Sequence, residues 1–554
     1  MSDLALSTRV KGSSVLAVFL VLSVTGTGLA QEPKETEYPL GKVQFPISCS
    51  DEAQQEFNRA VALLHHMTYP LAKTAFERVA ELDPKCAMAH WGVAMTLFQP
   101  LWPTRPGPDE LQQGWESVEK AKALAGPAEG EQFYIAAAEA FFRNPSETDY
   151  WERIRRWEQA METLYSKFSD DPEAKAFFAL AHLATAQVSG NALEHNNRAA
   201  EIALSIHAEN PLHPGSIHYL IHANDIRGRE HESLEIVRSY DNIAPRNPHA
   251  LHMPTHIFTR LGDWQEVIEW NQKAAEAALE HPAGDEGQYV WDEFPHAIEY
   301  LVYAYLQQGN DDAAVEQLER LKSTKQLHPT FKTAFHLSSI PARYALERRA
   351  WQEAAELVPR SYAALDWDRF PWPEAVTWFA KGLGAAHLGQ LDDAQRAHDR
   401  LQRLEDVANK AGEELFTRQI RVLRLAVSAW IAHLQGKGEQ ALELMEKAAE
   451  LEVATPKHPV TPAPTLPTHE LLGALLMELN NPDKALGAFN RSVELHPKRF
   501  NSILGAARAA QALEDEKTTK RFYAELLEIG VDKSNRGGLR EARTYIGELT
   551  NEKE

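Results

Sequence analysis

The stretch LAKTAFERVAELDP, residues 71–84, decides the fold. Ala72 and Phe76 are one helical turn apart on an apolar face, and Pro84 ends the helix. The same pattern of a Gly or Asn turn followed by an amphipathic helix returns several times along the chain. It stands at residues 261–266, 308–314, 388–394, 435–441 and 484–497. Helical hairpins of this size bury their apolar faces only by stacking, so the sequence predicts an all-α solenoid.

The spacing of Ala72, Phe76 and Pro84 resembles the second helix of a tetratricopeptide repeat. Residues 86–92, 213–222 and 248–262 look like those of a family of exported bacterial tetratricopeptide-repeat (TPR) proteins. The resemblance covers nearly the whole mature chain. It implies a right-handed superhelical solenoid of TPR-like hairpins, which holds a protein or peptide partner in its concave groove. It implies no particular reaction or ligand.

The composition narrows the functional classes. Acidic residues outnumber basic ones, the net charge is -22, and no local basic stripe is present, so nucleic acid is not an expected partner. Arg9 and Lys11 precede an apolar run at residues 15–24 and a small-residue end at 28–30, which reads as a cleaved export signal. No second run is long enough to span a membrane. We expect a periplasmic or secreted protein without an integral membrane segment after cleavage.

The chain divides into four expected parts: a signal peptide at 1–30, an N-terminal TPR-like solenoid with a His-rich groove at 45–360, C-terminal TPR-like repeats at 375–545, and a charged tail at 546–554. An insertion within residues 281–294 is expected to form a loop at the groove rim. A Pro-rich stretch at 455–467 precedes the last repeats.

The two cysteines, Cys49 and Cys86, flank the first predicted hairpin and fall at the same end of it. A disulfide between them would close a loop of about 38 residues and stabilise the fold by roughly 4 kcal/mol. The alternative is two separate buried thiols.

Histidines form the most informative pattern. Eight of the 23 fall between His207 and His256. His218 and His222 are spaced i, i+4, as are His252 and His256, and the two pairs are 34 residues apart. This repeat period places both pairs on one stripe of two successive first helices, which line the groove in tetratricopeptide arrays. His249 and Asp225 fall on the same stripe, and His296 and Glu299 extend it to a third repeat.

Imidazole pairs at this spacing chelate transition metals, so the stripe predicts a site for one or two Zn, Cu, Ni or Fe ions. Asp225 or Glu299 would add a ligand or orient a ring. Two alternatives stay open for these residues, a metal-free polar groove that binds peptide and a set of buried structural histidines.

No standard catalytic motif is present, and no catalytic residue is assigned. The primary prediction is a binding scaffold with a metal site. A metal-dependent hydrolase or oxidase that uses the same histidines is the alternative.

Other residues give weaker signals. His65, His66 and His90 are expected to pack in the first hairpins, and Met88 and Met95 in the core or along the groove. Three tryptophans lie near a possible break between the solenoid halves at residues 360–375, and they are typical of a packed junction; they are Trp367, Trp372 and Trp378. His458 and Glu470 border the Pro-rich stretch, where they would cover one end of the groove.

Overall fold

The computed structural model describes residues 38–551, apart from 103–104, 145, 147–148, 188–189 and 285–286. The expected export signal at residues 1–30 lies outside the described residues. Residues Pro39–Glu554 form one compact unit. The expected N-terminal and C-terminal repeats are therefore parts of one body, and the stretch near 360–375 is a connection within it.

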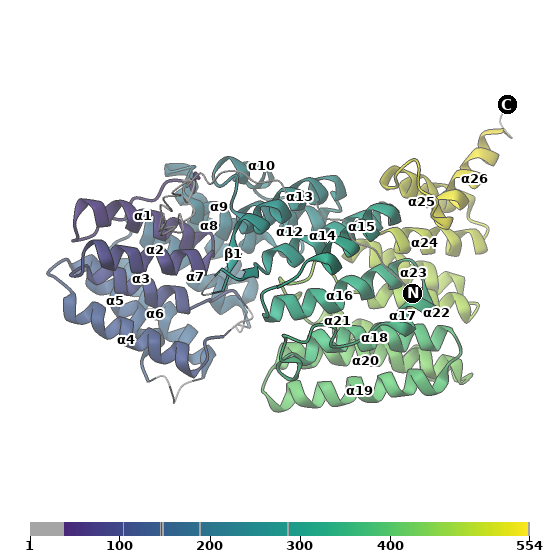
Figure 1. Ribbon diagram of the computed structural model, residues 1–554. Coiled ribbons are helices and arrows are strands. Elements are labelled where there is room, and N and C mark those ends of the chain that lie inside the picture. Colours follow the sequence, from purple (N-terminus) through teal and green to yellow (C-terminus); the bar gives the residue numbers. More distant parts are fainter. Residues whose placement is uncertain are drawn as a thin grey trace, which may run out of the picture. The chain divides into compact units, whose positions relative to one another are not determined.

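The unit is built of helices that pack on their neighbours in sequence (Figure 1). This arrangement confirms the predicted all-α solenoid of helical hairpins. The first eight helices are α1 (Asp51–His65), α2 (Tyr69–Leu82), α3 (Ala87–Leu97), α4 (Pro108–Leu124), α5 (Glu129–Phe142), α6 (Tyr150–Lys167), α7 (Pro172–Ala186) and α8 (Ala192–Glu209).

The middle of the chain carries shorter helices. They are α9 (Pro214–Asn224), α10 (Leu234–Arg238), the 3-10 turn η1 (Tyr240–Asn242), α11 (Pro248–His252), α12 (Pro254–Leu261), α13 (Trp264–Glu280), α14 (Glu293–Gln307) and α15 (Asp311–Ser323). Pro254 lacks an N–H and therefore separates α11 from α12 within what the sequence pattern presents as one first helix. Gly262 ends α12 at φ +68, and a Cβ there would stand 2.7 Å from the Pro497 carbonyl oxygen. Glycine is thus required at this turn by both conformation and space.

The insertion expected as a loop contains two short strands, β1 (Pro282–Ala283) and β2 (Tyr289–Val290), which pair antiparallel. Val290 also bridges Leu327, and its carbonyl accepts the backbone N–H of His328. The insertion is therefore anchored to the segment that precedes α16. It is a β-hairpin, which the helical pattern around it did not predict.

The remaining helices complete the solenoid. They are α16 (Phe331–Glu347), α17 (Trp351–Glu356), the 3-10 turn η2 (Trp367–Arg369), α18 (Pro371–His387), α19 (Leu391–Lys410), α20 (Glu414–Leu434), α21 (Gly438–Val453), α22 (Thr468–Glu478), α23 (Pro482–Leu495), α24 (Phe500–Ala512), α25 (Glu516–Ile529) and α26 (Gly537–Asn551). The last helix continues to Asn551, through most of the segment expected as a charged tail.

The last repeats return to the middle of the chain. The Trp264 indole N–H donates to the Lys498 carbonyl at 2.9 Å, and Val531 N–H donates to the Gln308 carbonyl at 3.0 Å. Arg499 is fully buried between the carboxylates of Glu347 and Glu470. These contacts join the turn before α24 and the segment after α25 to α13, α14, α16 and α22, so the last repeats close onto the middle of the solenoid.

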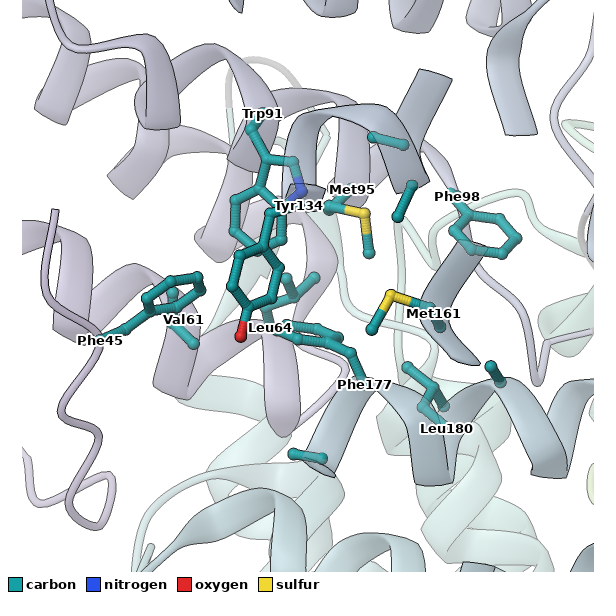
Figure 2. Close-up of a cluster of buried hydrophobic side chains, with 14 of the residues drawn as sticks. Phe45, Val61, Leu64, Trp91, Met95, Phe98, Tyr134, Met161, Phe177 and Leu180 are labelled. Atoms are coloured by element: carbon teal, nitrogen blue, oxygen red, sulfur yellow. The ribbon is translucent and has the colours of Figure 1, made fainter. Parts of the chain in front are cut away.

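Aromatic side chains dominate the N-terminal core (Figure 2). The Trp91 ring lies 5.7 Å from that of Phe45, 5.7 Å from Tyr134 and 5.6 Å from Phe177, all edge-on. Met95 is buried nearby and lies in the core. Edge-to-face contacts of this kind each add about 0.5–1.5 kcal/mol beyond the area they bury.

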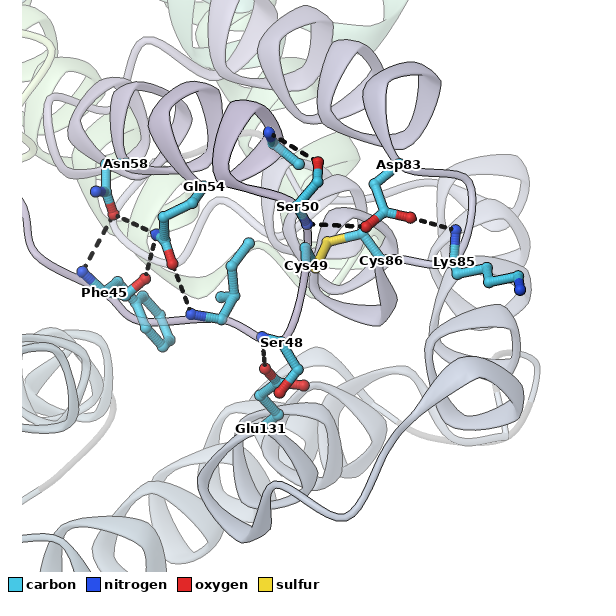
Figure 3. Close-up of a disulfide and its surroundings, with 12 residues drawn as sticks. Phe45, Ser48, Cys49, Ser50, Gln54, Asn58, Asp83, Lys85, Cys86 and Glu131 are labelled. Carbon is cyan, nitrogen blue, oxygen red and sulfur yellow. Dashed lines mark hydrogen bonds between the residues drawn. A yellow bond between two sulfur atoms is a disulfide. The ribbon is translucent and has the colours of Figure 1, made fainter.

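A disulfide joins Cys49 and Cys86, with their Cα atoms 5.3 Å apart (Figure 3). Cys49 precedes α1 and Cys86 caps α3, so the bond ties the chain entering the first hairpin to the chain leaving it, at one end of that hairpin. Next to it, the Ser50 N–H donates to the Asp83 carboxylate at 3.0 Å. The sulfur bridge and this hydrogen bond hold the terminal repeat against its neighbour.

Candidate metal centre

Three neighbouring parts of the solenoid bring six histidines together. His218 and His222 lie one turn apart on α9, and His296 lies in the first turn of α14. His249 and His252 are on α11, whereas His256 follows Pro254 on α12. The structure thus places every histidine of the predicted stripe in one region. It arranges them as two sets of three.

The first set contains His218, His222 and His249. One ring nitrogen from each lies within 4.8 Å of the other two. The His218 Nδ1–H donates to the His65 carbonyl at 2.6 Å, and His249 Nδ1 lies 3.4 Å from a Glu293 carboxylate oxygen. The Nε2 atoms of the three rings have no hydrogen-bond partner among the described residues.

The second set contains His252, His256 and His296, again with ring nitrogens within 4.8 Å of one another. The His252 Nδ1–H donates to the Asn271 side-chain oxygen at 2.7 Å. The His256 Nδ1–H donates to the Asp225 carboxylate at 3.1 Å. The Nε2 atoms of His252 and His256 face each other at 3.1 Å.

A relay of side chains orients His296. His336 Nδ1–H donates to the Glu299 carboxylate at 2.6 Å, which leaves His336 Nε2 to accept the His296 Nδ1–H at 3.0 Å. The Nε2 of His296 is thereby left without its proton. Glu299 is predicted as a ligand or an orienting group. Its carboxylate reaches the His296 ring only through His336, and it also binds Ser339 and Arg343.

The two sets are adjacent. The His222 and His256 rings are 6.4 Å apart, and so are the His249 and His252 rings. Both sets border a cavity of about 30 Å³, whose lining includes Met67, Trp102, Met253, Lys332 and Val460. A cavity of this size holds about one or two water molecules.

Burial favours the neutral form of five of these imidazoles. It lowers the pKa of His222 to about 3 and the pKa values of His218, His252 and His296 well below the ordinary value. Burial lowers the pKa of His256 as well, against the opposing effect of Asp225. A neutral imidazole offers one lone pair, which is the form that binds metal ions.

The neighbouring carboxylates stay ionised. Burial alone would raise the pKa of Asp225, but Arg260 and Lys457 beside it hold that pKa well below its usual value. The Glu293 pKa is lowered in the same way by Lys332, with which it forms an ion pair. The site therefore combines neutral rings with charged partners behind them.

The Pro-rich strap, residues 455–467, covers the histidines. Lys457 lies 3.3 Å from the Asp225 carboxylate, and His458 and Val460 line the small cavity. The expectation that the histidines line an open groove is therefore wrong: His218, His252 and His256 are 0%, 1% and 3% exposed. The strap follows the His-rich segment by some 200 residues, and no local spacing relates the two.

A larger cavity of about 400 Å³ lies on the other side of the strap. Its lining includes Arg260, Trp264, Tyr303, Trp372 and His458. His458 lines both cavities, and its expected role in covering one end of the groove stays a prediction. Glu470 instead binds Arg349 and Arg499 away from this position. The expected binding of a protein or peptide partner stays a prediction.

The sequence interpretation missed several residues of the site. Asn271 comes from the second helix of its hairpin, and His336 lies on α16, outside the His-rich segment. Glu293 and Lys332 lie beside the insertion, where the repeat register is interrupted. The i, i+3 step from Glu293 to His296 is the one signal that would have placed Glu293 on the stripe.

The earlier histidines have structural roles. His65 lies between the Tyr219 hydroxyl and Glu173, and His213 Nε2 contacts the other Glu173 oxygen at 3.1 Å. His66 Nε2–H donates to the Leu40 carbonyl. His65 and His66 thus have partners at both ring nitrogens, in keeping with the packing role expected for them, and His213 caps α9.

Among the described helices, none is both long enough and apolar enough to cross a membrane. No family model matches the chain, and neither does any curated protein sequence. Two solved structures that match are of the APC/C hetero-tetramer Cut9–Hcn1 and of Naa15/Naa10 bound to HypK-THB. The first is 15% identical, with 89% of this chain and 75% of that chain covered and a TM-score of 0.35. The second is 14% identical, with 88% and 70% covered and a TM-score of 0.23.

Proposed function

We propose that this chain is a helical-repeat binding protein that holds a pair of transition-metal ions in its two three-histidine sets. The observation that carries the proposal is the arrangement of the rings: buried imidazoles form two sets of three with ring nitrogens close together, and members of both sets line one cavity. The Nδ1 atoms of four rings are bound to a carbonyl, an amide, a carboxylate and a second imidazole; these rings are His218, His252, His256 and His296. Histidines that ligate metals characteristically make such outer hydrogen bonds.

Hydrogen bonding alone does not satisfy this arrangement. Each Nδ1–H that donates outward leaves an Nε2 lone pair, and lone pairs cannot bind one another. His252 and His256 Nε2 are both acceptors at 3.1 Å, and the buried Nε2 atoms of His218, His222 and His249 have no hydrogen-bond partner among the described residues. A cation at each set supplies what these five atoms lack.

The ligand type restricts the ion. Neutral imidazole suits Zn, Cu, Ni and Fe, and among divalent ions Cu²⁺ gives the highest affinity for a given nitrogen site. Three nitrogens would leave a fourth position in a tetrahedral site, and histidines of both sets line the shared cavity, which would give water or a substrate room beside the ion. This open position favours a metal-dependent hydrolase or oxidase as the second candidate function.

The partner and the compartment belong to the same proposal. Solenoid surfaces commonly bind protein segments, and the 400 Å³ cavity beside the strap is the candidate place for one. The disulfide and the N-terminal apolar run support an exported protein, since disulfides persist in oxidising compartments. Fractionation of cells that produce the full chain tests the location.

Metal analysis of matched variants tests the site. His222→Gln with His249→Gln should remove one equivalent of metal, and His252→Gln with His256→Gln should remove another. His231→Gln, at an exposed histidine, is the control. Glutamine keeps the polarity and approximate size, and circular dichroism verifies the fold. Unchanged metal content in both folded double variants would exclude the proposed sites.

A further inference from the structure

A further group of possible ligands lies in the N-terminal repeats, apart from the six histidines of the metal centre. It consists of Glu158 on α6, His182 on α7 and His195 on α8. The three side chains are 17%, 15% and 21% exposed, so they are reachable from solvent but held in place. The His182 ring also packs on Phe178, with centroids 4.4 Å apart, which restricts its rotation.

The ligand atoms form a nearly equilateral triangle. His182 Nδ1 lies 3.1 Å from Glu158 Oε1, His195 Nδ1 lies 3.2 Å from the same oxygen, and the two Nδ1 atoms are 3.0 Å apart. Zinc bonds of about 2.0–2.1 Å in a tetrahedron place neighbouring ligand atoms roughly 3.3–3.4 Å apart. The three atoms need to move only by tenths of an ångström to form one face of that tetrahedron.

Hydrogen bonds alone fit this triangle poorly. If both Nδ1 atoms carry a proton, both N–H groups point at one oxygen, and their hydrogens come close together and repel each other. If one is unprotonated, its lone pair faces the carboxylate oxygen, which is also an acceptor. A divalent cation on the triangle replaces both contacts with attractive ones.

We propose that Glu158, His182 and His195 bind a zinc ion, with the fourth position open to water or an external ligand. The His₂Glu donor set is one that zinc uses in proteins with an open coordination position. Because the three residues come from three successive helices, the ion would also join α6, α7 and α8. The site shares no residue with the paired centre, so either can fail without the other.

Zinc titration of the full chain by calorimetry tests this site. Relative to wild type, His182→Ala with His195→Ala should lose one zinc equivalent, and so should Glu158→Gln, which preserves the size of the side chain. Glu162→Gln, at an exposed position of the same helix, is the control. Zinc should also raise the Tm of a chain that lacks both three-histidine sets, and this increase should vanish on Glu158→Gln.

A crystal soaked with zinc gives a second readout that does not depend on the stability of the variants. An anomalous peak at the zinc edge between Glu158, His182 and His195 is expected. Equal zinc binding by wild type and the folded variants, or a zinc-loaded crystal without that peak, would overturn the assignment. The loss expected from the paired centre appears in different variants, so the two results are distinguishable.

Discussion

The Nε2 atoms of His252 and His256 lie 3.1 Å apart, although each ring donates its other N–H away from the pair. Two buried acceptors in contact cost free energy unless a proton or a metal ion lies between or beside them. Burial lowers the pKa of both rings, so at neutral pH a proton between them is less favourable than a metal ion. This relationship is the centre of the proposed metal site.

The outer hydrogen bond of His252 should control metal affinity. Asn271→Leu removes the acceptor for the His252 Nδ1–H without changing the six proposed ligands. We expect metal affinity to fall about 10- to 100-fold, as for other outer partners of ligating histidines. Competition with a chromophoric chelator measures the change. Asn409→Leu on α19, far from the histidines in sequence, is the control; an unchanged affinity for Asn271→Leu would contradict this role.

The metal-free fold should lose stability in acid. Burial lowers the pKa values of His66, His222 and His458 to about 3, whereas an unfolded chain binds those protons near pH 6.5. The unfolded state therefore gains protons that the folded state does not, and stability falls as pH drops from 6.5 toward 3. Each such group contributes about 1.4 kcal/mol per pH unit in that window.

Urea unfolding at pH 7 and at pH 5 measures this slope. The His458 ring lies among aromatic side chains, 5.5 Å from Trp372 and 5.9 Å from Phe416. His458→Phe should therefore fold, and the slope of its stability against pH should be smaller by about the contribution of one histidine. A slope identical to that of the wild type would show that His458 is not neutral in the folded state.

The strap should control exchange of the metal. Lys457→Met removes the ion pair with Asp225 that anchors the strap over the histidines. If the pair contributes about 1 kcal/mol, opening becomes roughly five times more frequent. Removal of metal by a chelator should accelerate by that factor, whereas Lys447→Met, an exposed pair with Glu443, should leave the rate unchanged. Equal rates would mean that metal leaves by another route.

The buried ion cluster of Arg499 should be essential to closure of the solenoid. Arg499→Met leaves the carboxylates of Glu347 and Glu470 without this partner, and we expect a loss of about 3–5 kcal/mol. Arg491→Met breaks an exposed pair with Glu494 and should cost less than about 1 kcal/mol. Urea denaturation compares the two; similar small losses would contradict the closing role.

The repeat pattern was sufficient to predict the helical hairpins, because turn, small and apolar residues recur in one register. The 34-residue period also predicted that His218 and His252 lie on neighbouring helices. The period could not predict that His249 joins the first set and not the set of His252, with which it shares the short helix α11. The repeat pattern describes an uninterrupted first helix, whereas here Pro254 divides that helix into α11 and α12.

The covering of the site was not predictable in the same way. Asn271 and His336 contact the histidines from neighbouring packed helices, and the strap that reaches them lies between α21 and α22, far from them in sequence. These contacts depend on how the repeats curve and close. Curvature accumulates from small rotations between hairpins, which no single stretch of sequence encodes.

Elemental analysis tests the central claim most directly. The full chain, purified without a histidine tag, is incubated with Cu²⁺ or Zn²⁺, dialysed, and compared with a variant that carries His222→Gln, His249→Gln, His252→Gln and His256→Gln. The account predicts that the wild type retains two more equivalents of metal than the folded variant. Equal retention by the two proteins would contradict it.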